Sequence, residues 1–598
     1  QLPDSNGLFR LLAGDTVHDL VLRAGDYDPA NLGTASSLVL GISDFIALGK
    51  SYAFNPPLVS DARMVKPSVL QGYRYAVVAE TGDVSDAAFY FPQKSVVMAG
   101  RDIANVQLDL QNLGDDISRV AAGRDVLYSN VLGNGTQWGL MPHIQIGGPG
   151  KLLVEAGRNV NLGAVNATKF SGSVLDSNDV TRIDAVGNTT NGSLQTAGAA
   201  SLIVMSGVDT GLLSTGQVDG LFSVLRSVGQ FQGLLGQVQS NAKSTEAAVV
   251  EANAVIQEAN QAIDVLFAGA VQPGSRAVYE APIDPNAAAG RSATGLMTDA
   301  YNGALAAANN AIAALFKAGR TGDITLYNAR VSTGTNPGAT GGDINLLAPN
   351  GNINVGLPTA SSGRNIGIYT TSGGAINAYL SGDMNVNLSK VATFQGGDIL
   401  LYTSGDGSTL DAGRGSRSAR TSSPPRLVAE LKADGTPTGK LLLLPPLDVS
   451  GSGIRTVSYD PDGFGPLQQP DPGKVYLLAP TGTIDAGEAG VSSASGLVVA
   501  ALVVKNADNF SASGSSVGVP SVSSGVPAAP VSGDAAASAS KAMDAMAQAN
   551  NALASEKDAD IKSFRPSFVT VEVLGFGGES AECGKDDALC RKQKNGGT

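Results

Sequence analysis

Residues 341–356, GGDINLLAPNGNINVG, contain the pattern that indicates the fold of this chain. It holds two short apolar runs, each introduced by glycine with aspartate or asparagine. Much of it returns far downstream, because the pattern LLAPxGxIxxG at 346–356 recurs at 477–487. A self-match across so wide a gap indicates internal repeats, which are the sequence signature of a repeat architecture.

Related units fill the middle of the chain. Glycine followed by aspartate and an apolar residue occurs at Gly322, Gly342, Gly382 and Gly397, and Gly363 opens a similar GRNI run. Successive glycines lie 20, 21, 19 and 15 residues apart. Units this short cannot bury a core alone, so we expect them to stack.

Each unit reads as two short strands with alternating side chains. The apolar members of the quoted stretch should point one way and its asparagines the other: Ile344, Leu346, Ile353 and Val355 against Asn345 and Asn354. Glycine, asparagine and aspartate suit corners where the backbone needs a positive φ. These features predict mainly β structure, as a right-handed parallel β-helix. An antiparallel sandwich is the alternative, disfavoured because the turns recur as one motif rather than as varied hairpins.

A second corner motif, Ala-Gly-Arg-Asp/Asn, occurs three times near the N-terminal end. The steps between copies are 23 and 34 residues, so one rung carries an insertion. Each arginine could pair with the aspartate or asparagine of a neighbouring rung. Such a ladder is ordinarily a solvated structural feature, and each exposed pair contributes little. The candidate corner residues are Gly100, Arg101, Asp102, Gly123, Arg124, Asp125, Gly157, Arg158 and Asn159.

Two stretches between the β units have helical spacing instead. Apolar residues follow a 4-3-4-3-4 pattern over 248–266 and again over 297–315, which is typical of heptad seams. The two stretches also match each other in sequence. We predict an inserted, alanine-rich helical hairpin. This hairpin is either a purely structural insertion or a docking or spacer element. A third stretch with similar spacing, 539–553, predicts a C-terminal helix that could join the pair as a bundle.

These patterns divide the chain into segments. The predicted segments are 1–95, an irregular strand-rich part of distorted rungs or a small side domain; 96–214, β-helix rungs; 215–320, the helical insertion; 321–510, rungs with a loop insertion at about 416–473; 511–534, a linker; 535–578, a terminal helix and a capping strand; and 579–598, a cysteine-containing tail.

Composition narrows the class of protein. The chain has 598 residues, 75 of them glycine, with only 5% aromatic residues, which suits stacked rungs better than one large globular core. The formal net charge is −13, which argues against a nucleic-acid partner. No apolar run approaches the ~18 residues needed to cross a bilayer. The start at Gln1 leads us to expect a fragment or a processed product.

The two cysteines, Cys583 and Cys590, lie in the tail with six residues between them. Two thiols without a nearby histidine are too few for structural zinc, and the spacing is not that of a CxxC redox motif. A small disulfide loop is the best interpretation, and it implies an oxidising compartment. A merely incidental tail loop stays open as an alternative.

The repeated AGR[DN][IV] and GGD[IV] rungs resemble the long exoproteins of bacterial two-partner secretion, the filamentous-haemagglutinin-like family. Residues 475–485 (VYLLAPTGTID) and 565–577 (RPSFVTVEVLGFG) resemble a C-terminal region found in some of these proteins. The family's N-terminal secretion domain is not present, as in a C-terminal fragment. Some surface-retained members end in a cysteine pair, and the resemblance implies that Cys583 and Cys590 form such a hook on the periplasmic side of the transporter pore.

The resemblance implies a structural protein of the cell surface. We expect the cell-proximal end of a long adhesin, secreted through the periplasm and tethered at the outer membrane, with its tail periplasmic. Its expected partners are the outer-membrane transporter and, through missing distal regions, a matrix polysaccharide or a host or neighbouring cell surface. We expect no nucleic-acid partner, no cofactor, no metal site and no catalytic residues.

Two other functions stay open. One is a carbohydrate- or matrix-binding β-helix, for which Tyr369, Tyr379 and Tyr402 are candidates for sugar stacking, although they could equally be rung fillers. The other, less favoured, is a polysaccharide-degrading β-helix enzyme, because no paired carboxylates can be placed on one face. The only histidines, His18 and His143, are expected to be surface or loop residues rather than general bases.

Overall fold

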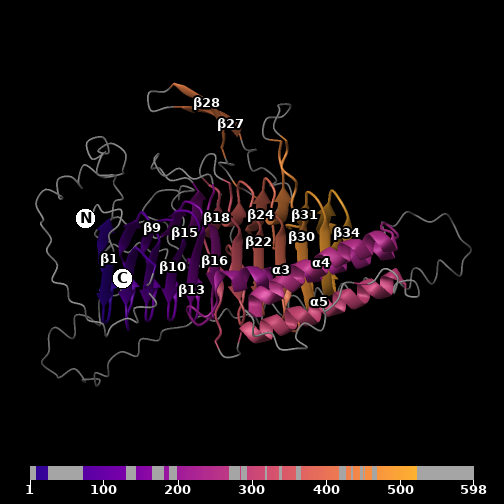
Figure 1. Ribbon diagram of the computed structural model, residues 1–598, viewed down its shortest axis with the longest axis horizontal. Helices are drawn as coiled ribbons and strands as arrows, with labels where there is room; N and C mark the ends of the chain where they lie inside the picture. The colour runs from indigo at the N-terminus through magenta and orange to yellow at the C-terminus, as the bar shows by residue number, and fades with distance from the viewer. Residues whose placement is uncertain are drawn as a thin grey trace, which may run out of the picture. The chain divides into compact units, whose positions relative to one another are not determined.

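The computed structural model describes residues 9–23, 70, 72–128, 143–163, 181–187, 198–267, 283, 292–316, 320–335, 340–358, 365–415, 426–431, 436–444, 449, 451–460 and 468–520. These residues form a parallel β-helix whose strands stand side by side in Figure 1. A 21-stranded sheet and an 11-stranded sheet hold all of its described strands. The predicted fold class, a mainly β parallel solenoid with inserted helices, is confirmed.

The strands fall into three ladders, so that each full rung contributes one strand to each ladder. Ladder one contains β1 (Phe9–Ala13), β4 (Tyr75–Ala79), β7 (Ser95–Ala99), β10 (Ile117–Ala122), β13 (Lys151–Ala156), β16 (Ser201–Met205), β19 (Ile344–Ala348), β22 (Ile376–Leu380), β25 (Ile399–Thr403), β30 (Val475–Asp485), β32 (Leu497–Lys505) and β34 (Ser516–Val517). Ladder two contains β2 (Val17–His18), β5 (Val84–Ser85), β8 (Ile103–Ala104), β11 (Val126–Leu127), β14 (Val160–Asn161), β17 (Ile324–Leu326), β20 (Ile353–Val355), β23 (Met384–Asn385) and β26 (Thr409–Asp411), and it continues into the second halves of β30 and β32.

Ladder three forms the separate 11-stranded sheet. It contains β3 (Val21–Arg23), β6 (Ala88–Phe91), β9 (Gln107–Gln111), β12 (His143–Gly147), β15 (Thr181–Gly187), β18 (Ala329–Thr333), β21 (Gly367–Thr370), β24 (Lys390–Phe394), β29 (Gly453–Val457), β31 (Val491–Ser493) and β33 (Phe510–Ala512). A short 3-10 helix, η4 (Ala507–Asn509), joins β32 to β33.

The alternation predicted for residues 344–355 is confirmed. Ile344, Leu346, Ile353 and Val355 are all buried in the interior of the solenoid. The asparagines face outward, where Asn377 Nδ2 donates to Asn345 Oδ1 at 2.9 Å and Asn385 Nδ2 donates to Asn354 Oδ1 at 3.0 Å. Parallel stacking in register places like residues above one another, so each outward asparagine bonds its counterpart in the next rung.

The corner between ladders two and three requires left-handed backbone, as the glycine, asparagine and aspartate pattern predicts. The residue that turns this corner has a positive φ in rung after rung. The non-glycine members are Asp19, Asp86, Asn105, Asn328, Asn387 and Asn506, with φ between 48° and 53°. Asparagine and aspartate tolerate this conformation better than other residues with a Cβ, which explains their recurrence.

The corner between ladders one and two leaves no room for a side chain. A Cβ built on Gly123 would lie 2.2 Å from the carbonyl oxygen of Gly100 in the preceding rung. One built on Gly157 would lie 2.1 Å from the oxygen of Gly123. Glycine is therefore required at this position, because rungs about 4.8 Å apart bring the stacked backbones into direct contact.

The helical insertion lies between β16 and β17. It consists of α3 (Thr215–Gln239), α4 (Thr245–Phe267) and α5 (Ala293–Leu315). The heptad patterns identify α4 and α5, but α3 was not expected as a helix. Its valines, leucines and phenylalanines are buried almost all round, because α4 and α5 cover one side and the sheet covers the other. A helix covered on several sides has no narrow apolar stripe for a periodicity search to find.

In three other segments the structure differs from what the sequence predicts. Residues 9–23 and 75–91, within the segment expected to be irregular, contribute β1 to β6 to regular ladders. The segment expected to be a loop, 416–473, contains the rung strand β29 and an antiparallel hairpin of β27 (Arg426–Leu431) and β28 (Pro437–Leu444). The segment described as a linker begins with the end of β33 and with β34. The predicted terminal helix, capping strand and tail lie outside the described residues.

The corner contact generates a stability prediction. We expect Gly123→Ala to lower the free energy of unfolding by about 1–3 kcal/mol, because the new methyl group must displace backbone atoms of the preceding rung. The midpoint of chemical denaturation, followed by circular dichroism, measures this effect.

Gly496→Ala is the matched control. A Cβ at Gly496 meets no atom closer than Ser515 Oγ at 3.6 Å, so there is room for it. We expect its stability to stay the same or to rise by about 0.4–1 kcal/mol through the unfolded state. Equal losses for the two variants would contradict the close-contact explanation.

Candidate functional site

The corner residues singled out from the sequence form one continuous ladder. At each step an aspartate or asparagine side chain accepts the backbone N–H of the next rung. Asp83 Oδ1 accepts from Asp102 N at 2.9 Å, Asp102 Oδ1 from Asp125 N at 3.1 Å, and Asp125 Oδ1 from Asn159 N at 2.9 Å. The same pattern runs on through Asn159, Asp323, Asn352, Asp383 and Thr409.

The arginines of the motif pair with these carboxylates. Arg101 binds Asp83 through Nε at 3.1 Å and through NH2 at 2.7 Å. Arg124 and Arg158 pair in the same two-pronged way with Asp102 and Asp125. Burial alone would raise the pKa of Asp125, but its bonds from Arg158 and from the Asn159 N–H outweigh that effect and lower the pKa.

The arginines are about half exposed, so solvent screens their ion pairs. The backbone bonds are worth more, because losing the acceptor leaves a partly buried N–H without a partner. The hydrogen bonds from backbone N–H groups to the corner side chains therefore fix the register of the stacked rungs. The ion pairs between arginine and aspartate contribute less.

Variants at Asp102 and Arg124 separate these two contributions. We expect Arg124→Met and Asp102→Asn each to cost less than about 1 kcal/mol of stability, since both keep an oxygen in place for the Asp125 N–H. Asp102→Ala removes that oxygen and should cost about 1–3 kcal/mol. Denaturant midpoints for the three proteins test the order, and an Arg124→Met loss equal to that of Asp102→Ala would overturn it.

The helical insertion covers the outer face of ladder one. In Figure 1, α3 runs across the strands and along the row of rungs. Its 25 residues span about 37 Å, enough to cross eight strands spaced about 4.8 Å apart. At one end Asp219 forms an ion pair with Lys151 of β13, and at the other Gly236 packs against Val517 of β34.

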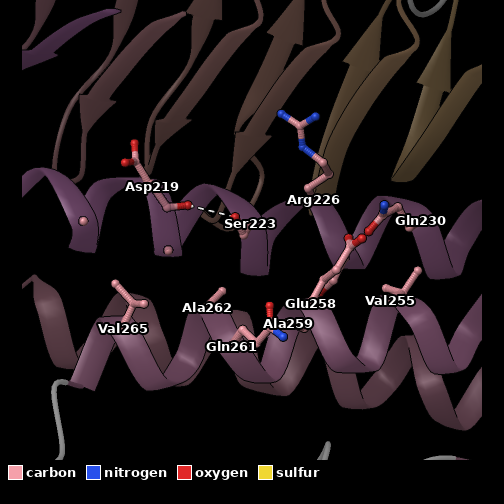
Figure 2. Close-up of a pocket in the computed structure, with 13 residues that line it drawn as sticks. Asp219, Ser223, Arg226, Gln230, Val255, Glu258, Ala259, Gln261, Ala262 and Val265 are labelled. Atoms are coloured by element: carbon pink, nitrogen blue, oxygen red, sulfur yellow. Dashed lines mark hydrogen bonds between the residues drawn. The ribbon is translucent and has the colours of Figure 1, made fainter. Parts of the chain in front are cut away.

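A second apolar core lies between the helices and the sheet. It includes outward-facing residues of ladder one: Leu153, Ile203, Leu347, Tyr379, Leu400, Tyr402, Tyr476, Leu478, Val498 and Ala500. Arg226 adds a polar anchor, with NH1 at 3.0 Å from Asp398 Oδ2 and NH2 at 2.9 Å from Asn377 Oδ1. Figure 2 shows this arginine pointing away from α4 and toward the strands. The insertion is thus fastened to rungs that follow it in the sequence.

A groove of about 460 Å³ lies between α3 and α4. Small residues, Gly216 and Gly220 on α3 and Ala259 and Ala262 on α4, let the helices approach closely there. Asp219, Ser223 and Gln230 on one side and Glu258 and Gln261 on the other line it with polar groups (Figure 2). None of the described residues that line this groove is aromatic.

The tyrosines proposed for sugar stacking are buried, so that interpretation is wrong for all three. Tyr379 and Tyr402 are each 1% exposed because α3 and α5 cover them, and Phe316 stacks on Tyr379 with ring centroids 5.5 Å apart. Tyr369 is 2% exposed on the outer face of ladder three. Each ring fills space between layers and presents no face to a ligand.

The two histidines differ. His18 is about half exposed, as predicted, and its Nδ1 lies 2.8 Å from Ser85 Oγ. The prediction for His143 is wrong, because it begins β12, is 4% exposed, and places Nε2 at 3.0 Å from Asp109 Oδ1. The parallel pairing of β9 with β12 brings these residues together, although 34 positions separate them in the sequence.

Two general features of the described residues bear on function. They contain no group of three or more histidine, cysteine, aspartate or glutamate side chains placed to hold a metal ion. None of their helices is both long and apolar enough to cross a membrane. Cys583 and Cys590 lie outside the described part of the chain.

Comparison with known proteins gives a family match. Residues 396–521 match a family model described as filamentous haemagglutinin family outer membrane protein. No curated protein and no solved structure matches the chain. The matched segment includes VYLLAPTGTID at 475–485 and the GGDI run at 396–399, so the resemblance drawn from these runs is confirmed for this part of the chain. The AGR[DN] copies and residues 565–577 lie outside the match.

Packing of α3 on the sheet generates a prediction with an internal control. Gly229→Ala should lower the stability by about 1–2 kcal/mol, because its Cβ would lie 2.6 Å from the ring of Tyr476. Gly233→Ala, one turn further on, meets only Val498 Cγ2 at 3.4 Å and should gain up to about 1 kcal/mol from helix propensity. Thermal unfolding followed at 222 nm compares the two, and a loss for both would argue against the close contact with Tyr476.

Proposed function

We propose that this filamentous-haemagglutinin-like chain is the structural, cell-proximal part of a long bacterial surface adhesin. The match of residues 396–521 to a family of outer membrane proteins carries the proposal. The protein would act as a stiff spacer, without catalysis, that holds a distal binding region away from the cell. That distal region, rather than the described rungs, would contact a matrix polysaccharide or another cell surface.

The architecture supports a spacer. Every described strand of ladder one pairs in parallel with its neighbours, and the row of strands spans roughly 50 Å at about 4.8 Å per rung. The aspartate and asparagine ladder reinforces one corner of each rung it reaches, and the helical insertion bridges from β13 to β34. Bending the solenoid would break several of these contacts at once, which favours transmission of force along its axis.

The tail supplies the anchor in this proposal. A disulfide between Cys583 and Cys590 would close a small loop at the end of a chain that threads an outer-membrane transporter pore. An extended chain passes a narrow pore, but a closed loop does not. The tail would therefore stay periplasmic while the rungs stand at the cell surface.

Partition between cells and culture medium tests the anchor. The native full-length protein is compared with a Cys583→Ser and Cys590→Ser double variant, and both fractions are quantified by immunoblot. We expect the double variant to be shed into the medium while total secretion holds, because an open tail no longer stops in the pore.

The control carries Ala581→Ser with Ala588→Ser, which adds two hydroxyl groups to the same tail and keeps both cysteines. It should remain on the cells. Unchanged retention of the cysteine variant would overturn the anchor while leaving the spacer role in place. Loss of the control together with the cysteine variant would show that the tail sequence, and not the disulfide, holds the protein.

A further inference from the structure

The interior core of the solenoid is open at its last described rung. Ala501 and Val504 of β32 pack against this core but are only partly buried. Ala479 and Ile484, which lie opposite them in the preceding strand β30, are 0% exposed. The earlier residues are covered by a further rung, whereas no described rung covers the last ones. This end of the solenoid therefore exposes part of its apolar interior.

The backbone edge at the same end is also free. β32 is nine residues long, but β34, which follows it, pairs only with Leu497 and Val498. Within the described part of the chain, the rest of β32 pairs with β30 alone. Two large apolar residues stand out on this stretch, since Leu502 is 74% exposed and Val503 is 44% exposed. An exposed apolar edge strand of this kind favours pairing with another strand.

The chain beyond the described residues contains a run that suits this edge. Residues 568–574, FVTVEVL, alternate three valines with Thr570 and Glu572, which is the pattern of a strand with one buried face. The segment that follows β34 directly, 521–534, is less suitable because it contains two prolines and two glycines. The 47 residues between Pro520 and the FVTVEVL run are long enough to bring the run back to the edge.

We propose that residues 568–574 bind along the free edge of β32 as an additional strand and close this end of the solenoid. The three valines of the run would cover Ala501 and Val504, while Thr570 and Glu572 would face solvent. The backbone of the added strand would pair with the N–H and C=O groups that β30 leaves free. Stacked repeats need such a cap, because an uncovered last unit exposes both its core and its edge.

The cap would connect the proposed anchor to the spacer. Cys583 follows Leu574 by nine residues, so a pull on an anchored tail would reach the rungs through the added strand. The cap itself does not depend on the anchor, because it is inferred from the open end of the solenoid. Retention on cells tests the anchor and amide exchange tests the cap, so failure of one is distinguishable from failure of the other.

Hydrogen–deuterium exchange of the full chain, followed by mass spectrometry, tests the cap. In the wild type, the fragments that contain residues 499–505 and 568–574 should both be protected. Val571→Asp would place a carboxylate against the apolar interior, so the added strand should detach. Residues 568–574, and those amides of 499–505 that do not bond to β30, should then exchange at least tenfold faster.

Thr570→Asp is the matched control, because it introduces the same charge one position away, on the opposite face of the added strand. It should leave both fragments protected. Fast exchange of 568–574 in the wild type, unchanged exchange of 499–505 in Val571→Asp, or equal acceleration in the two variants would overturn the proposal. Protection of 499–505 that grows with protein concentration would show that a second copy occupies the edge, and would also overturn it.

Discussion

The contact between stacked glycine corners is the constraint on which the structure depends. The oxygen of Gly100 occupies the place where a Cβ of Gly123 would stand, and Gly157 repeats the contact one rung later. Only a corner without side chains lets successive rungs approach to hydrogen-bonding distance. Once that spacing is set, the neighbouring aspartate or asparagine meets the next backbone N–H, and the arginine meets that carboxylate. The three residues of the motif therefore act together to stack the rungs, and glycine is the residue that this stacking requires.

The solenoid has two cores rather than one. Its interior is filled by the alternate residues of all three ladders, and a second core lies between ladder one and α3 to α5. Strands such as β25 (ILLYT) are consequently buried on both faces, which explains their nearly continuous apolar sequences. The helices also connect rungs far apart in the chain, since α3 precedes most of the strands it covers. A spacer built this way resists bending more than bare rungs would.

The polar outer faces serve different purposes. Asn345 and Asn377 stack beside α3, and Asn377 accepts from Arg226, so this pair belongs to the packing of the helical cover. On ladder three, Asp184 accepts a hydrogen bond from Arg330 and lies beside Arg182, so these buried charges neutralise one another.

The repeat, the parallel β-helix, the corner residues and the helices α4 and α5 could all be predicted from the sequence, because each depends on a local spacing that recurs. Tertiary structure alone decided the position of α3, the burial of Tyr379 and Tyr402, and the pairing of His143 with Asp109. Local periodicity shows that a residue points out of a strand, but not whether another layer covers it. That depends on which segment packs against the outer face, and α3 lies more than 130 positions from Tyr379 in the chain.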